Sequence, residues 1–298
     1  MTSATVRRIG LAVSHFMLVV LMAVLFNFLV ELAIPRAVPD PRPIPYLFQL
    51  YLDSLADARA MRIISNALPW TLGLLIPAIL IAFAIGTPLG AYLGRSGNSG
   101  RSTLFSTPVI VLASVPAFLL GMALTALFAV QLGWFPGAGA FSPTLIFERD
   151  RIATGIDLVI HAILPITTIA LGGIGLFAVA MRGTVTMSVA DDHVLFADAL
   201  GLTPRRLFWA HLVRPSLLPQ VTGLALLLSI VVAGTVLVEA NFNYPGLGYI
   251  LYRAILGDDL PVMRGVTFVL IVGLAFSMAM VELAYPWLDP RVRTSGKG

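Results

Sequence analysis

Long apolar runs alternate with shorter polar segments along the whole chain. A helix that spans a bilayer needs about 20 consecutive, mostly apolar residues. Six runs meet this requirement and predict an all-α integral membrane protein with six transmembrane helices, at about 9–34, 67–93, 104–131, 161–181, 217–239 and 265–288. Arg7 and Arg8 before the first run resemble the start of a signal peptide. That run is too long for one and no clear cleavage site follows, so we expect the helix to be retained.

Composition supports the same class of protein. Of the 298 residues, 58% are hydrophobic and only 11% are charged, whereas about a quarter of a soluble domain is charged. The chain contains no Cys. Disulfides, thiolate metal sites and Cys nucleophiles are therefore excluded.

Basic residues predict which side of the membrane each loop occupies, because cytoplasmic loops carry an excess of Lys and Arg. With the N-terminus inside, eleven of the 19 Lys and Arg residues fall in inside segments and eight in outside segments. This excess favours a cytoplasmic N-terminus. Six spans then return the C-terminus to the cytoplasm.

The polar segments divide the chain into three parts. Residues 1–65 hold the first helix and an external segment that opens Pro-rich ("PRAVPDPRPIP"), which is typical of extended chain. Residues 66–293 form a core of five helices, whose longest inside loop is 182–216, and residues 294–298 form a cytoplasmic tail.

The longest inside loop carries start and stop signals for two short helices. Asp191 or Asp192 can cap the first helix. Gly201 suits the left-handed position just after its end, with Leu202 making the hydrophobic contact that follows. The next pair, Thr203-Pro204, suits the cap and first position of a second helix.

The first short helix offers small and apolar side chains. Ala197 and Gly201 are four residues apart, so they share one side and permit close approach of another surface. An isolated helix of about ten residues is marginal in water, so something should pack on it. We expect a docking surface for a partner protein, formed by Leu195, Phe196, Ala197, Asp198, Ala199, Gly201, Leu202 and Arg205.

This segment resembles the cytoplasmic loop of ABC importer permeases, Glu-Ala-Ala-x-x-x-Gly, and in particular that of the B-type permease of dipeptide and oligopeptide importers. In that family the loop reads close to Ala-Arg-Ala-Lys-Gly-Leu, and here it reads Ala197-Asp198-Ala199-Leu200-Gly201-Leu202. The Gly and both Ala residues remain. Both basic positions are lost, and Leu195 stands where the general motif has Glu. The family's downstream His, Asn and Pro appear as His211, Pro215 and Pro219.

The resemblance extends over about residues 66–293. Several segments look like family segments in family order, among them "TLGLLIPAILIAFAIGTPLG", "LGWFPGAG", "HAILPITTIALG", "VEANFNYPGLG" and "ELAYPWLDPRVR". The N-terminal part departs, because "AIPRAVPDP" stands where the family has Pro-Gly-Asp-Pro.

The resemblance implies a permease subunit of an ATP-driven importer for peptides or similar small solutes, in a bacterial inner membrane. Such a subunit pairs with a second, homologous permease and two ATPase subunits, and an extracytoplasmic binding protein delivers the substrate. The short cytoplasmic helix sits in a cleft on an ATPase subunit and moves as a lever. Besides these proteins, the chain is expected to contact membrane lipid and no nucleic acid.

The chain has no Gly-x-x-x-x-Gly-Lys-Ser/Thr phosphate loop. ATP and Mg²⁺ are therefore expected on the partner ATPases, with no cofactor, metal or catalytic residue in this chain. An ion-coupled secondary transporter is the alternative, but that class usually shows ionisable residues and broken helices near the midplane. An intramembrane enzyme is the third hypothesis, and no nucleophile–base or metal constellation supports it.

Two acidic residues stand out because charge inside a bilayer is costly. Glu239 lies near the outer end of the fifth span, where we expect an interfacial structural role rather than a substrate contact. Glu282 lies in the sixth span, where an ion pair and a place along the transport path both remain open. An external turn is predicted at Pro245, Gly246 and Gly248, before a short interfacial helix at 246–257.

Two glycine groups each allow two interpretations. Gly86, Gly90 and Gly94 recur every four residues, which suits either packing within the chain or an interface between subunits. Gly172, Gly173 and Gly175 in the fourth span suit either a hinge or simple close packing.

Overall fold

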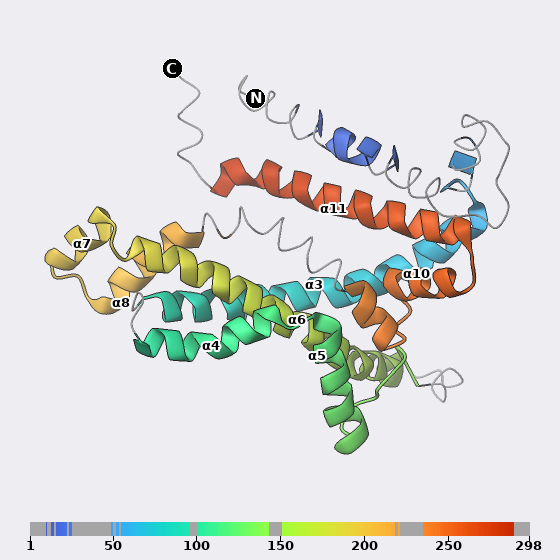
Figure 1. Cartoon of the computed structure of the whole chain (residues 1–298), viewed down its shortest axis with the longest axis horizontal. Coiled ribbons are helices and arrows are strands. Elements are labelled where there is room, and N and C mark those ends of the chain that lie inside the picture. The colour runs from blue at the N-terminus through green and yellow to red at the C-terminus, as the bar shows by residue number, and fades with distance from the viewer. Residues whose placement is uncertain are drawn as a thin grey trace. The chain divides into compact units, whose positions relative to one another are not determined.

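The computed structural model describes residues 55–95, 100–142, 151–217 and 235–288, together with residue 220 and short stretches within 10–25 and 49–53. The predictions for the tail 294–298, for most of the first and fifth spans and for most of the external segment 35–65 lie outside the described residues. Helices and turns make up the described part of the chain, which contains no strand (Figure 1).

The chain forms two compact units. One runs from Gly73 to Asn243, and the other combines the described residues up to Leu72 with those from Tyr244 onward. Helix α3 (Ala58–Gly94) contributes residues to both.

The unit that includes the C-terminal helices is built from the start of α3, α10 (Leu247–Leu256) and α11 (Leu260–Leu288), and α10 lies beside α11 in Figure 1. Small and branched side chains form its core: Ala60, Ile64, Ala67, Leu247, Ala254, Val262 and Val266. The backbone N–H of Leu247 donates to Thr71 Oγ1 over 2.8 Å, which fixes the start of α10 on α3. Arg59 and Asp259 form an ion pair at 2.5 Å.

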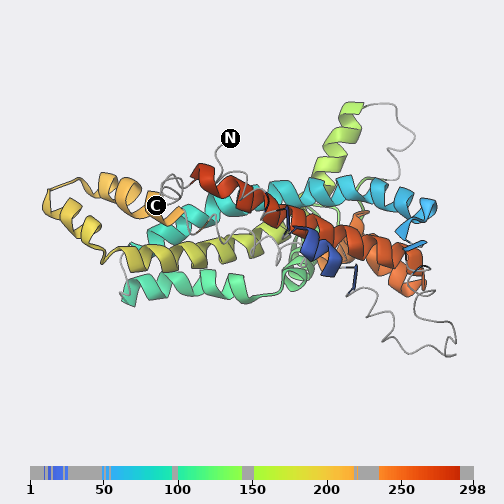
Figure 2. The ribbon, with the colours of Figure 1, turned by 90° about the horizontal axis from the view of Figure 1, so that it is seen from above.

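The Gly73–Asn243 unit contains the remaining helices. Helix α4 (Gly100–Ser114) and helix α5 (Ala117–Leu124), which continues into the π-helix η1 (Thr125–Gln131), both pack on the long helix α6 (Arg151–Ser188). Beyond α6 the chain forms α7 (Asp192–Ala199), α8 (Pro204–Arg206) and the π-helix η3 (Leu207–Val213). Figures 1 and 2 show α7 and α8 together at one end of α6.

Glycines bring α3 and α6 into backbone contact. A Cβ added at Gly86 would lie 2.7 Å from the carbonyl oxygen of Ile174, and one added at Gly90 would collide with the backbone of Ala178. Gly94 makes the same approach to Arg182, at 2.8 Å. Of the two interpretations of this row, packing within the chain is the one that the structure shows.

The glycines of α6 also serve packing. A Cβ at Gly173 would lie 2.7 Å from Ala82 Cβ, and one at Gly175 would lie 2.5 Å from the backbone nitrogen of Ala113 in α4. Helix α6 runs unbroken past both positions. They let α3 and α4 approach α6, and the structure shows no hinge there.

Three described helices are long and apolar enough to cross a membrane: α3, α6 and residues 260–280 of α11. The run at 104–131 was expected to form one span. In the structure it forms two helical segments, Leu104–Ser114 and Ala117–Gln131, that meet at 97°. Pro116 has an extended backbone (φ −55°, ψ 134°), and a residue before proline, here Val115, disfavours the helical region. The bent pair adds a fourth span if it crosses once, so six spans remain a prediction.

Candidate functional site

The first short helix predicted within the loop 182–216 is present as α7, which begins after Asp191. Gly201 adopts the left-handed conformation, with φ of +75°. Its N–H donates to the Asp198 carbonyl at 2.8 Å, and the N–H of Leu202 donates to the Ala197 carbonyl at 3.4 Å. These two bonds form a complete Schellman motif. They end α7 at the predicted position.

The second helix also starts as predicted. Thr203 is the cap residue, although its side chain makes no capping hydrogen bond, and Pro204 is the first helical residue. The chain then continues through α8 into η3, so that α7 and η3 form a short helical hairpin. His193 reinforces the hairpin, because its Nε2 lies 3.3 Å from the carbonyl oxygen of His211.

One face of α7 is buried against this chain. Val194 joins a cluster of buried side chains from the last turn of α3, the end of α6 and η3: Ala91, Met181, Val185, Leu212 and Val213. The cluster ties the hairpin to the ends of two long helices. A displacement of α7 therefore acts directly on α3 and α6, since close-packed interiors transmit strain.

The structure corrects the expected role of Ala197. It was assigned to the docking surface as a small residue open to a partner, but it is only 3% exposed within the chain. Ala197 follows Val194 by three residues, so the helical period places both on the inner face. Its small size serves packing inside this unit. Gly201 remains exposed, and a Cβ there would meet nothing within 4 Å.

The opposite face of α7 is apolar and open. Leu195 is 55% exposed, Phe196 67% and Leu200, the C-cap residue, 65%. Phe196 and Leu200 lie four residues apart, so they are neighbours on one side of the helix. Ala199 is exposed beside them. This group of four residues is called the outer face of α7 below.

Charged side chains flank the outer face. Asp192 and Asp198 are exposed acidic residues on α7, and Arg205 and Arg206 are exposed basic residues on α8. Within the described part of the chain, neither Asp198 nor Arg205 takes part in an ion pair. The hairpin thus presents unneutralised charge of both signs around an apolar surface.

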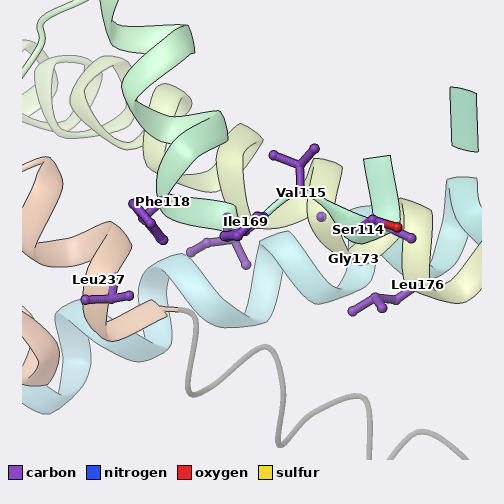
Figure 3. Close-up of a pocket in the computed structure, with 11 residues that line it drawn as sticks. Ser114, Val115, Phe118, Ile169, Gly173, Leu176 and Leu237 are labelled. Atoms are coloured by element: carbon purple, nitrogen blue, oxygen red, sulfur yellow. The ribbon is translucent and has the colours of Figure 1, made fainter. Parts of the chain in front are cut away.

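A cavity of about 280 Å³ lies at the break between α4 and α5. Its walls come from the break itself, from α6 and from Leu237 (Figure 3). Apolar side chains, including Phe118, Ile169 and Leu176, dominate the lining, and Ser114 contributes a hydroxyl. Sequence reasoning missed this cavity. Pro116 was the available signal, together with Gly172, which lines the cavity and has no neighbour within 4 Å of an added Cβ.

The other predicted residues fall in different places. Glu239 is fully buried in the helical segment 235–241, where it interacts with another group of the chain. Glu282 belongs to α11, but its side chain lies outside the described residues, so both of its suggested roles stay predictions. In the described part of the chain, no group of three His, Asp or Glu side chains is placed to hold a metal ion.

The external turn predicted at Pro245, Gly246 and Gly248 is partly a helix start. Gly246 precedes the first residue of α10 and is buried, and Gly248 lies inside α10 and is also buried. Helix α10 occupies Leu247–Leu256, within one residue of the short helix expected at 246–257. Its exposed side chains include Tyr252, Ile255 and Leu256.

The helices α3, α6 and α11 have the length and apolar composition of membrane-spanning helices, and the α7 hairpin packs on the ends of α3 and α6. Comparison with known families identifies the class more closely. Residues 86–294 match the family described as the binding-protein-dependent transport system inner membrane component. The chain belongs to this family and is a membrane permease component of such a transport system.

Individual relatives agree. A Brucella abortus protein named as a peptide transport system permease is 34% identical over 236 residues, which is 77% of this chain and 72% of the relative. The dipeptide transport system permease protein DppB of Bacillus subtilis is 29% identical over 235 residues, or 79% and 71% of the two chains. The D,D-dipeptide transport system permease protein DdpB of Escherichia coli is 30% identical over 243 residues, or 76% and 71%.

Proposed function

We propose that this chain is one of two permease subunits of an ATP-driven importer for peptides or similar small solutes. In this proposal it crosses a bacterial inner membrane six times, with both termini in the cytoplasm. A second, homologous permease completes the translocation path, two ATPase subunits drive it, and an extracytoplasmic binding protein delivers the substrate. The relatives named for peptide and dipeptide transport support this substrate class.

The observation that carries the proposal is the division of α7 into two faces. Its inner face belongs to a cluster with the ends of α3 and α6, whereas Leu195, Phe196 and Leu200 on its outer face are exposed. A helix of this kind suits a lever, because one side is fixed to the spans and the other is free to bind a moving subunit. Closure of the ATPases on ATP would displace α7, and the buried cluster would pass that displacement to α3 and α6.

The division of labour follows from the sequence. Without a phosphate-binding loop in this chain, ATP and Mg²⁺ bind the ATPase subunits, and the permease does mechanical work only. Specific binding of ATP by the purified chain alone would contradict this assignment.

Gly201 offers a sharp test of docking through α7. Gly201→Trp and Gly201→Ala both place a side chain on a left-handed residue, and this costs about 1–2 kcal/mol in each case. The space around Gly201 is open within the chain, so the extra bulk of Trp is felt only by a docked partner. We expect Gly201→Ala to retain most ATPase association and Gly201→Trp to lose it, together with substrate uptake.

The measurement is co-expression of the chain with the genes that neighbour its own and co-purification of any ATPase subunit, followed by uptake into proteoliposomes. Both variants should reach the membrane in wild-type amounts. If Gly201→Trp retains as much ATPase as Gly201→Ala, docking through α7 is wrong. Uptake by the chain alone on an ion gradient would instead support the secondary-transporter alternative.

A further inference from the structure

The outer face of α7 carries three large apolar side chains within six residues, each more than half exposed. A contiguous exposed apolar patch bordered by polar residues marks an interaction surface. Its position beside Arg205 and Asp198, both exposed, adds charges that restrict which partner fits. This inference rests on the proposed docking of α7 to an ATPase subunit and concerns the chemistry of that subunit.

The charges of α7 itself are acidic. Asp192 and Asp198 are its acidic residues and both are exposed, and neither Lys nor Arg occurs in the helix. Asp198 forms no ion pair in the described part of the chain. The carboxylate is therefore available to a cation on whatever surface covers the outer face.

This arrangement inverts the pattern that the sequence resembles. The Ala-Arg-Ala-Lys-Gly loop presents two positive charges, whereas the corresponding positions here are Asp198 and Leu200. A surface complementary to an Arg and a Lys offers acceptors or acidic groups. On this chain, an acidic group of such a surface would be repelled by the Asp198 carboxylate. A polar group opposite Leu200 would lose its water without gaining a hydrogen-bond partner.

We infer that the ATPase subunit matched to this chain receives α7 in a groove with an apolar floor for Phe196 and Leu200 and a basic residue opposite Asp198. An ATPase built for the basic loop does not fit. The surface thus gives the transport system a dedicated motor, through attraction to its own partner and repulsion of others. An apolar contact of this kind also resists salt, because screening weakens charge pairs and not apolar burial.

The test uses the full-length chain in lipid nanodiscs with the ATPase subunits that co-purify with it. The double variant Asp198→Arg with Leu200→Lys restores the basic pattern. We expect it to weaken ATPase binding at least about tenfold, since it removes an apolar contact and opposes like charges. The wild-type complex should persist at about 0.5 M NaCl.

Asp53→Arg is the control, because it makes the same acid-to-base change at an exposed residue outside the α7 hairpin, and it should leave binding unchanged. A second probe is an ATPase subunit from a dipeptide importer whose permease carries the Ala-Arg-Ala-Lys-Gly pattern. That subunit should bind the double variant more tightly than the wild type.

Each outcome has a definite meaning. Equal binding of the matched ATPase to the wild type and the double variant overturns the inference, and so does an equal loss of binding with Asp53→Arg. In both cases the docking proposal survives if Gly201→Trp still abolishes binding. Failure of the wild type to bind any ATPase overturns both proposals together.

Discussion

At the scale of single residues, two glycines of α3 experience opposite surroundings. Gly90 lies directly against the backbone of Ala178 in α6, whereas a Cβ added at Gly73 would meet nothing within 4 Å. Both residues are helical, so backbone conformation does not separate them. Any difference between their substitutions must come from packing.

We therefore predict opposite effects of the same substitution. Gly90→Ala forces α3 and α6 apart and should destabilise the protein by about 1–3 kcal/mol, the usual cost of overpacking. Gly73→Ala introduces no clash and should stabilise it by up to about 1 kcal/mol through helix propensity. Thermal unfolding of the detergent-solubilised protein measures both. Equal stability of the two variants would show that α3 and α6 are not in backbone contact.

At the scale of elements, α7 has one buried face and one exposed face, to which the proposed function gives the roles of attachment and docking. Val194 faces the cluster with Met181 and Val185, whereas Leu195, the next residue, is exposed. The proposed function therefore gives these two neighbouring residues different roles. Substitution of Val194 or Leu195 by Ala can separate the attachment of α7 to the long helices from its proposed contact with the ATPase.

Val194→Ala should weaken the packing of α7 on α3 and α6 by about 2 kcal/mol, because apolar burial is lost and a cavity is left. ATPase subunits should still bind, but uptake per ATP hydrolysed should fall several-fold. Leu195→Ala should weaken ATPase binding about tenfold, because the side chain loses an apolar contact worth about 1.5 kcal/mol. Binding assays and coupled transport assays report the two effects separately. The two-face account fails if Val194→Ala abolishes binding while Leu195→Ala leaves it unchanged.

Local signals in the sequence were enough to place α7. Gly201 and the pair Thr203-Pro204 act through their own backbone preferences, so their effect does not depend on distant contacts. The helix accordingly ends where these residues predict. The faces of α7 were harder to predict, because burial of Ala197 depends on η3 folding back beside α7, and no local pattern states that.

Hydropathy located the middles of the long helices and missed their ends. The apolar run at 161–181 lies inside α6, which extends to Arg151 and Ser188 through polar turns that remain helical. The run at 104–131 appeared continuous because hydropathy does not indicate whether the helix axis changes direction within an apolar run. Its bend follows from Pro116, and the adjoining cavity depends on how α5 and α6 pack, so neither followed from the apolar pattern.

At the scale of the whole molecule, the proposed function makes this chain a transport subunit that is powered by separate ATPase subunits. The family match places the chain among permease components, and the α7 hairpin connects an exposed surface to the ends of two long helices through one buried cluster. A separate ATPase could act on this chain through such an arrangement, because it combines an exposed surface to bind with close packing against the long helices.

The chain contains no cysteine, so a single introduced cysteine is an unambiguous reporter. Phe196→Cys places a thiol on the outer face of α7, and Trp134→Cys places one at a residue that is similarly exposed and lies on the external side in the proposed topology. Both are treated with a short thiol-to-amine cross-linker in membranes that import substrate. The account predicts a covalent adduct with an ATPase subunit from Phe196→Cys and none from Trp134→Cys. Active transport with no ATPase adduct at Phe196→Cys would contradict it.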